Sequence, residues 1–294
     1  MLNRIAIVGV GLIGSSFALA AKRGHPSISI LGVDASETAL AQARARGAID
    51  VTGTFEQAAR ADLILIAIPV GQMADALDCL APHLAAHTVI IDAGSTKRNV
   101  MAAAAAALGA RAGQFVACHP IAGRERHGPN AADETLFVGK HVVLCAAPEN
   151  PHAALQMARD AWQMVGANVL DMPASAHDEV FAAVSHLPHM LAFALVDELA
   201  SRRNARQLFE YAASGFRDFT RIASSSPEMW RDIALNNQPA LLAEMDAYIA
   251  KAVELRELLA AADASALLAL MQRAQSARDH WLSGQLDQFH DDQT

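Results

Sequence analysis

Residues 5–16 read IAIVGVGLIGSS, an apolar run that ends in a glycine-rich turn. Gly9 permits a tight corner between a strand and a helix, and Gly11 leaves no Cβ between the backbone and an approaching pyrophosphate. Gly14 lets the new helix pack closely on the strand, and the free N–H groups and dipole of that helix face the phosphates. The stretch therefore predicts a dinucleotide-binding turn. The residues expected at the cofactor are Gly9, Gly11, Leu12, Ile13 and Gly14.

The residues that follow the turn favour NAD as the dinucleotide. A second apolar run ends at Asp34, which lies 20 residues after Gly14. An acid at this spacing accepts a hydrogen bond from the adenosine ribose, and its charge repels the 2′-phosphate of NADP. Ala35 supplies no compensating cation, so NAD is favoured over NADP. Pro69, at the end of a later apolar run, is expected to touch the cofactor as well, and the alternative is a tight turn that binds no ligand.

Strand and helix patterns alternate up to about residue 172. The apolar runs that predict strands lie at 5–8, 28–31, 62–68, 89–91, 115–118, 142–144 and 169–170. Between them, Ser36 is a candidate N-cap, and Thr54 with Gln57 forms a capping-box pattern. This alternation predicts an α/β, Rossmann-type doubly wound sheet over residues 1–172, which binds NAD(P).

From residue 174 onward helical periodicity dominates, and this predicts an all-α dimerisation and substrate domain over residues 173–294. Ser175 is a candidate N-cap, and Pro188 is expected to break or kink the helix that contains it. A helical domain this apolar would expose a large patch as a monomer. A homodimer built on it is therefore expected.

Composition restricts the partners and the location. Hydrophobic residues make up 53% of the 294 residues, yet no uncharged run approaches the roughly 18 residues of a membrane span. The net charge of −8 argues against nucleic acid and anionic membranes. Three widely spaced cysteines without a pairing pattern, and no visible signal peptide, predict a cytoplasmic protein.

Polar clusters follow several of the predicted strands and recur in the helical half. Residues 92–97 read DAGSTK, residues 119–125 read HPIAGRE, residues 184–189 read VSHLPH, and residues 215–223 read GFRDFTRIA ahead of MWRDI at 229–233. In this order behind the glycine turn, these strings resemble the prephenate and arogenate dehydrogenases of tyrosine biosynthesis. The resemblance covers nearly the whole chain and is to the single-function form of these enzymes. It implies NAD(P)-dependent oxidative decarboxylation of prephenate, arogenate or both, to 4-hydroxyphenylpyruvate or tyrosine.

The resemblance also implies roles for individual residues. His119 matches the catalytic histidine, which polarises the substrate hydroxyl, and Ser95 matches the serine that orients that histidine. Arg221 matches the arginine that pairs with the ring carboxylate. Further residues match positions that line or gate the substrate site, and these are Glu125, Asp218, His177, His189 and Ser185. Arg124 departs from the small polar residue more often found there, and the preference between prephenate and arogenate stays open.

Other interpretations of the same residues remain. His119 alone could bond a backbone carbonyl at a strand end, Ser95 could cap a helix, and Arg221 could pair with Asp218. His186 and His189 lie three apart, but no third ligand has suitable spacing, so no metal site is predicted. A β-hydroxyacid dehydrogenase would need a catalytic lysine in the helical half, where Lys251 lies far from any motif. A non-enzymatic NAD-sensing protein would not need the histidine, serine and arginine set.

Overall fold

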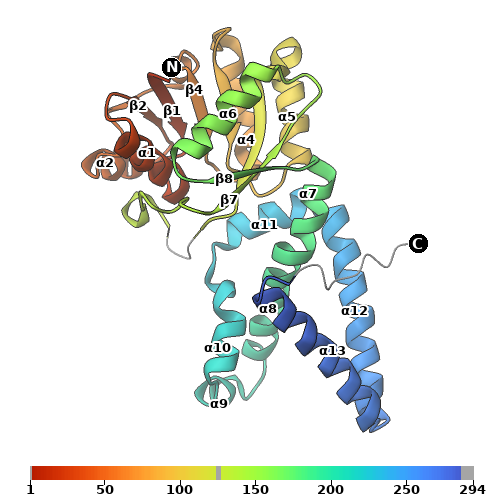
Figure 1. Cartoon of the computed structure of the whole chain (residues 1–294). Helices are drawn as coiled ribbons and strands as arrows, with labels where there is room; N and C mark the ends of the chain where they lie inside the picture. Colours follow the sequence, from red (N-terminus) through yellow and green to blue (C-terminus); the bar gives the residue numbers. More distant parts are fainter. Residues whose placement is uncertain (1, 124–126, 286–294) are drawn as a thin grey trace. The chain divides into compact units, whose positions relative to one another are not determined.

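The computed structural model describes residues 2–123 and 127–285. Within these residues eight strands form one sheet, in the order β3-β2-β1-β4-β5-β6-β7-β8. Their bounds are β1 Arg4–Val8, β2 Ser29–Val33, β3 Val51–Thr52, β4 Leu63–Ile66, β5 Val89–Asp92, β6 Phe115–Pro120, β7 His141–Cys145 and β8 Asn168–Asp171. The α/β doubly wound sheet expected from the sequence is thus confirmed, and β3 is a short additional edge strand (Figure 1).

One pairing departs from the parallel pattern. β6 and β7 are antiparallel, with His119 opposite Val143, whereas all other neighbours in the sheet are parallel. A parallel neighbour would need a crossover connection, usually a helix, and the chain between these two strands contains no α-helix in its described part. Instead it passes through the short 3-10 turn η4 (Pro129–Ala131). The apolar runs predicted both strands but not their relative direction.

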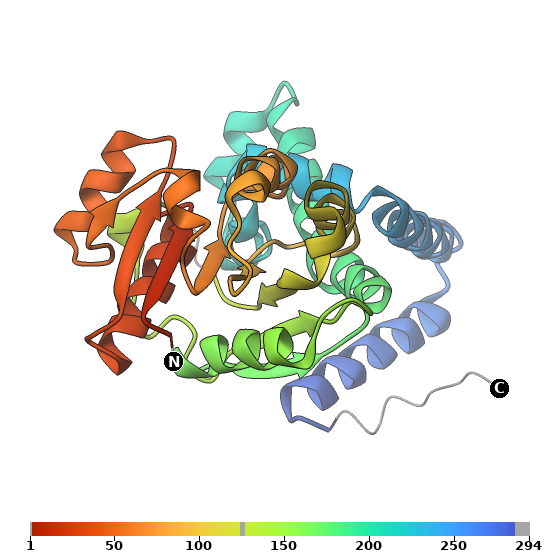
Figure 2. The ribbon, with the colours of Figure 1, turned by 90° about the horizontal axis from the view of Figure 1, so that it is seen from above.

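Helices cover both faces of the sheet. One core cluster joins the sheet to α1 (Leu12–Gly24), α2 (Glu37–Ala45) and α6 (His152–Met164). The second joins the opposite face to α3 (Phe55–Ala58), α4 (Met73–Leu80) and α5 (Arg98–Leu108). Seen from above, α6 lies on one side of the strands and α4 and α5 lie on the other (Figure 2). Such double cover explains why runs like Leu63–Ile66 are apolar at every position.

The predicted helix caps at the start of the chain are present. Ser36 accepts a hydrogen bond from the Ala39 N–H, and Thr54 and Gln57 form a reciprocal capping box. Since β1 lies between β2 and β4, the connections leave in opposite directions at this point of the sheet. A crevice outside the carboxyl ends of the strands is where such sheets bind ligands.

The helical half begins with a continuous helical segment of three parts. These are α7 (Ala174–Phe181), a π-helical turn η5 (Ala182–His186) and α8 (Leu187–Ala200). The irregularity expected at Pro188 takes the form of this π turn and not of a break: a proline ring has no N–H to donate and crowds the preceding turn, and the wider π turn accommodates it. The N-cap predicted at Ser175 is wrong: Pro173 occupies that position.

The segment Ala174–Ala200 also bears on the membrane question. By length and composition it could cross a membrane, with a mean hydropathy of 1.5 over its most apolar window, only 22% of which is buried in this chain. The expectation that no uncharged run approaches the length of a membrane span is therefore wrong, because residues 180–196 carry no Asp, Glu, Lys or Arg. The segment also carries polar residues, His177 and Asp178, that are buried in this fold.

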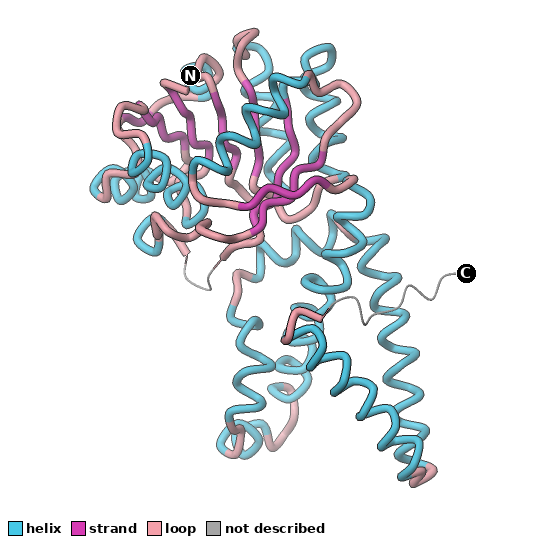
Figure 3. The backbone as a smooth tube through the Cα atoms, in the orientation of Figure 1, coloured by secondary structure: helices cyan, strands magenta, loops and turns pink. Residues whose placement is uncertain are grey.

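The remaining helices complete the chain, and Figure 3 shows no strand after β8 in the described residues. They are α9 (Ala205–Glu210), α10 (Ser214–Thr220), the 3-10 turn η6 (Arg221–Ser224), α11 (Pro227–Asn236), α12 (Gln238–Ala260) and α13 (Ala264–Leu282). By compactness the chain divides into Met1–Leu241 and Leu242–Thr294. The functional boundary at residues 172 and 173 stays a prediction.

Candidate active site

The glycine turn joins β1 to α1 with little room for side chains. Gly9 has φ +91°, and a Cβ there would lie 2.4 Å from the carbonyl oxygen of Ala67. A Cβ on Gly14 would lie 2.1 Å from the carbonyl oxygen of Gly9. These two positions therefore require glycine for the fold itself.

Gly11 differs from its neighbours, because a Cβ there would meet no atom within 4 Å. It is the N-cap of α1 and has no side-chain capping bond, so the first N–H groups of this helix remain available to a ligand. Leu12 and Ile13, in the first turn, are half-buried and pack against the core. The turn thus offers open backbone donors at a positive helix end, which suits a pyrophosphate.

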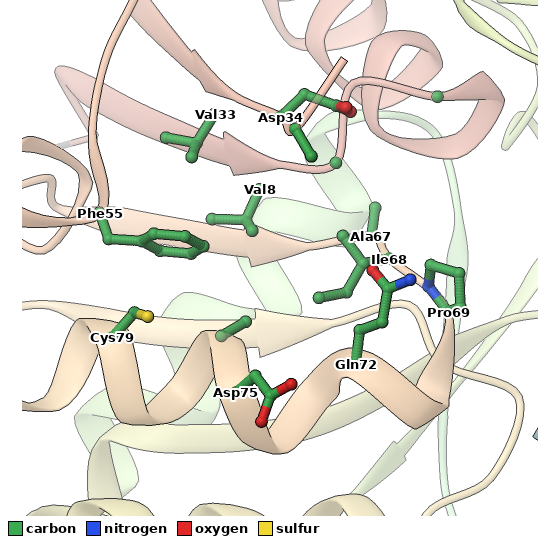
Figure 4. Close-up of a pocket in the computed structure, with 14 residues that line it drawn as sticks. Val8, Val33, Asp34, Phe55, Ala67, Ile68, Pro69, Gln72, Asp75 and Cys79 are labelled. Carbon is green, nitrogen blue, oxygen red and sulfur yellow. The ribbon is translucent and has the colours of Figure 1, made fainter.

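A cavity of about 510 Å³ lies beside this turn. Its apolar wall includes Val8, Val33 and Phe55, and Asp34 and Pro69 line it as well (Figure 4). The Asp34 Oδ2 atom accepts the Val10 N–H at 2.9 Å and the Oδ1 atom accepts the Ser36 N–H at 2.8 Å. Each carboxylate oxygen keeps a further lone pair, so the same aspartate can hold the loop and still accept a ribose hydroxyl. The cavity and its residues fit the adenosine half of a dinucleotide.

His119 lies at the carboxyl end of β6 and is partly exposed. Its Nδ1 atom is 2.8 Å from His177 Nε2, and His177 Nδ1 is in turn 2.8 Å from Asp178 Oδ1. The rings of Phe181 and His119 pack in an edge-to-face arrangement, with centroids 4.8 Å apart and an interplanar angle of 62°. Because His177 and Asp178 are buried on α7, this helix fixes one side of the His119 ring.

A buried ion pair supports the same region from the sheet side. Lys97 donates from Nζ to the Asp92 carboxylate and, at 2.6 Å, to the carbonyl oxygen of Cys118. Asp92 also accepts the Cys118 N–H at 2.8 Å. Neither charged side chain is exposed. The pair therefore ties the end of β5 to the residue that precedes His119.

The pKa of His119 lies well below its usual value, because burial penalises the charged ring and Lys97, His177 and His186 add positive potential. Burial also lowers the pKa of His177, against the opposing effect of its bond to Asp178. At neutral pH both rings are uncharged. A neutral imidazole can accept a proton, so His119 can serve as a general base towards a ligand at the end of β6.

A second group of rings lies on α8 and α11. The His189 ring stacks on Trp230, with centroids 3.5 Å apart and an interplanar angle of 20°. Its Nδ1 atom lies 2.9 Å from the carbonyl oxygen of Ser185, which fixes the ring through the helix backbone. Buried His186 lies 3.1 Å from the amide nitrogen of Asn237. His189 and Ser185 are thus next to each other, on the helical segment that carries His177.

The other expected substrate residues are placed as follows. Asp218 is exposed on α10 and Arg221 is exposed on η6, and both elements pack against α8. Ser95 is half-buried in the loop between β5 and α5. It does not occupy the N-cap of α5, which is Lys97. Glu125 and Arg124 lie outside the described residues.

The sequence interpretation gave no role to several residues that shape this site. Lys97 and Trp230 stood within the strings that carried the resemblance, and Asp178 follows His177, but nothing in the sequence shows which of them are buried. No local signal marks either charge as buried, since Thr96 and Arg98 flank Lys97, and His177 and Glu179 flank Asp178. Among the described residues, no group of three or more His, Cys, Asp or Glu could hold a metal ion.

Comparison with known proteins places this arrangement in a family. Residues 17–171 match the family model described as prephenate dehydrogenase, nucleotide-binding domain, and residues 173–273 match prephenate dehydrogenase, dimerization domain. A cyclohexadienyl dehydrogenase of Zymomonas mobilis is 37% identical over 280 residues, which cover 94% of this chain and 95% of that protein.

Solved structures of related proteins superpose on this chain over nearly its full length. The prephenate dehydrogenase from Aquifex aeolicus, in complex with hydroxyphenyl propionate and NAD+, has a TM-score of 0.89 and 33% identity, covering 95% of this chain and 98% of its own. The arogenate dehydrogenase of Synechocystis has a TM-score of 0.79 and 28% identity, with 95% and 99% covered. With both family models and a relative of this identity and coverage in agreement, the chain belongs to the prephenate dehydrogenase family.

Proposed function

We propose that this protein catalyses the NAD-dependent oxidative decarboxylation of prephenate, arogenate or both, as a step of tyrosine biosynthesis. The observation that carries the proposal is the uncharged His119 at the carboxyl end of β6, in a chain of this family. A group that accepts the proton of a hydroxyl while hydride departs has to be neutral before the reaction.

The cofactor proposed is NAD, held by Gly9, Gly11 and Gly14 at the pyrophosphate and by Asp34 at the adenosine ribose. Leu12, Ile13 and Pro69 complete this set. Bound NAD+ would supply the hydride acceptor. Support comes from the open N-terminus of α1 and from Asp34, whose carboxylate would lie against the 2′-phosphate of NADP.

At the substrate, His119 accepts the proton of the C4 hydroxyl as the C4–H bond gives up hydride. Cleavage of the bond between C1 and its carboxylate then releases CO2, and the electron pair enters the ring, which becomes aromatic. We assign Ser95 to orienting His119 and the hydroxyl, and Arg221 to binding the ring carboxylate through a bidentate guanidinium contact. The residues assigned to lining or gating the site are His189, Ser185, Asp218 and Glu125. His177, expected from the sequence to line it too, is fully buried and bonds His119.

We further propose a cytoplasmic homodimer, formed through the helical residues from 173 onward. The most apolar window of the segment Ala174–Ala200 is only 22% buried within one chain, and Val184, on η5, is 67% exposed. Apolar surface that a single chain leaves unburied is typical of a subunit interface. The match to the family's dimerization domain supports the same assignment.

Steady-state turnover with prephenate and with arogenate, each with NAD and with NADP, tests the function. The expected result is NADH formation with one CO2 released per NADH, with at least one of the two substrates. If the protein binds NAD but turns over neither compound, the enzymatic assignment fails and an NAD-sensing protein becomes the better account. A β-hydroxyacid dehydrogenase has less support, since Lys251 forms an ion pair with Glu254 along the exposed surface of α12.

A further inference from the structure

Three side chains form a continuous hydrogen-bonded line behind the proton acceptor. His119 Nδ1 lies 2.8 Å from His177 Nε2, and His177 Nδ1 lies 2.8 Å from Asp178 Oδ1. His177 and Asp178 are 0% and 1% exposed, whereas His119 is partly exposed at the open end of the line. The line therefore runs from a buried carboxylate towards the site.

Asp178 is anchored as an anion at the start of α5. Its Oδ1 atom accepts the Lys97 N–H at 2.8 Å, and its Oδ2 atom accepts the Arg98 N–H at 3.0 Å. Although burial raises the pKa of this carboxyl, the hydrogen bonds from His177 and from these two N–H groups hold it below its usual value. An ionised carboxylate offers only lone pairs, so His177 Nδ1 has to carry a proton.

The position of the proton on His177 determines the position of the proton on His119. An uncharged imidazole with its proton on Nδ1 presents a lone pair at Nε2, so His177 Nε2 accepts a hydrogen bond from His119 Nδ1. His119 therefore carries its own proton on Nδ1, and its Nε2 atom is left with a free lone pair. The opposite arrangement would need a cationic His177, which burial and the charge of Lys97 disfavour.

We propose that Asp178 and His177 are positioning residues that hold His119 in the tautomer whose Nε2 atom accepts the substrate proton. When that proton arrives, it forms the Nε2–H bond of His119 as the O–H bond of the substrate breaks. The resulting imidazolium keeps its Nδ1–H hydrogen bond to His177, and the negative Asp178 at the end of the line stabilises its charge. The catalytic role of this tautomer rests on the proposed function. In this assignment His177 lies behind His119 and accepts a hydrogen bond from it.

The direct test is the tautomer itself, read by nitrogen NMR of the protein labelled with 15N in its histidine rings, without substrate and at neutral pH. The resonance of His119 is assigned by its loss in the His119→Gln variant. We expect a protonated Nδ1 and an unprotonated Nε2. In Asp178→Asn, whose amide can donate a hydrogen bond to His177, we expect a second tautomer of His119 to appear.

Kinetics provide the second readout. His177→Leu removes the acceptor for His119 Nδ1, and we expect kcat to fall about 100-fold, with KM nearly unchanged. His177→Gln restores an acceptor oxygen near the position of Nε2 and should recover part of the loss, which a purely structural role would not explain. Glu179→Gln, which removes an exposed charge from the same helix, serves as the matched control and should leave kcat and the tautomer unchanged.

The proposal is overturned if wild-type His119 carries its proton on Nε2, or if His177→Leu keeps the wild-type kcat. The NMR result needs no turnover and no variant of Asp178, so it stands even if Asp178→Asn does not fold. A wild-type protein with the expected tautomer but no activity on prephenate or arogenate would contradict the proposed function and support the positioning assignment.

Discussion

The Lys97 ammonium group donates to the Asp92 carboxylate at a place where neither side chain is exposed to solvent. Asp92 is the last residue of β5, and Lys97 also donates to the carbonyl oxygen of Cys118. The pair therefore fixes the backbone at the end of the sheet next to His119. Its positive charge is one reason why His119 stays neutral. Lys97 thus contributes both to the structure of this site and to the low proton affinity of His119.

Replacing Lys97 without its partner Asp92 should destabilise the folded protein. In Lys97→Met the Asp92 carboxylate stays buried without its partner, and we expect the free energy of unfolding to fall by about 3–5 kcal/mol. Chemical denaturation measures it. The double variant Asp92→Asn/Lys97→Met buries no charge at this pair and should recover part of the loss. A double variant that is less stable than Lys97→Met would show that the pair is not the origin of the effect.

Two glycines of the turn should respond differently to alanine. Gly14→Ala places a Cβ 2.1 Å from a backbone oxygen, and we expect the melting temperature to drop, since overpacking costs about 1–3 kcal/mol. Gly11→Ala meets no protein atom and should fold normally, yet its methyl group would stand in the path of the pyrophosphate, so the KM for NAD should rise. Thermal unfolding and cofactor titration separate the two. Equal melting temperatures for both variants would contradict the packing argument.

Cofactor preference should depend on Asp34. We expect kcat/KM for NAD to exceed that for NADP by about 100-fold, which corresponds to about 3 kcal/mol of repulsion between Asp34 and the 2′-phosphate. Replacing Asp34 by Ser and Ala35 by Arg removes that charge and adds a cation, so the ratio should move towards NADP. Ala35→Arg alone is the control, and it should shift the ratio less. If the ratio of kcat/KM for NAD to that for NADP is unchanged in the double variant, Asp34 does not determine the cofactor preference.

Much of the fold could be predicted from the sequence, because its signals are local. The runs that became β1, β2, β4 and β5 are apolar in the way that a doubly covered sheet requires, and the Ser36 cap depends on neighbouring residues only. The direction of β7 depends on how a long connection returns, which no local pattern specifies. The cap expected at Ser175 is wrong, because the N-cap is Pro173 and the helix therefore starts two residues earlier, at Ala174.

The residues of the candidate site also divide into those that local sequence patterns predict and those that depend on long-range contacts. Gly11 and Asp34 follow from spacing along the chain, and the structure places both beside one cavity. The support behind His119 could not be foreseen, because Lys97 and Asp178 lie 81 residues apart and meet only when α7 packs against the start of α5. Whether a histidine bonds a carboxylate, a second histidine or a substrate is decided by such long-range contacts.

Stability should decrease in acid through the buried histidines. Burial lowers the pKa of His186 from 6.5 to about 4, so the unfolded state takes up the proton first as the pH falls. The contribution of this group is complete above pH 6.5 and is lost between pH 6.5 and about 4, by about 3 kcal/mol in total. Denaturation at several pH values measures the slope, which should be shallower in His186→Gln. His152→Gln, an exposed control, should keep the wild-type slope, and equal slopes in all three proteins would refute the assignment.

The central claim is that His119 accepts the proton of the substrate hydroxyl, and the turnover of His119→Ala tests it most directly. Measured as NADH formation from the substrate that the wild type prefers, kcat should fall by about 100-fold or more, while the KM for NAD stays close to the wild-type value. Near-normal turnover by His119→Ala would contradict the account.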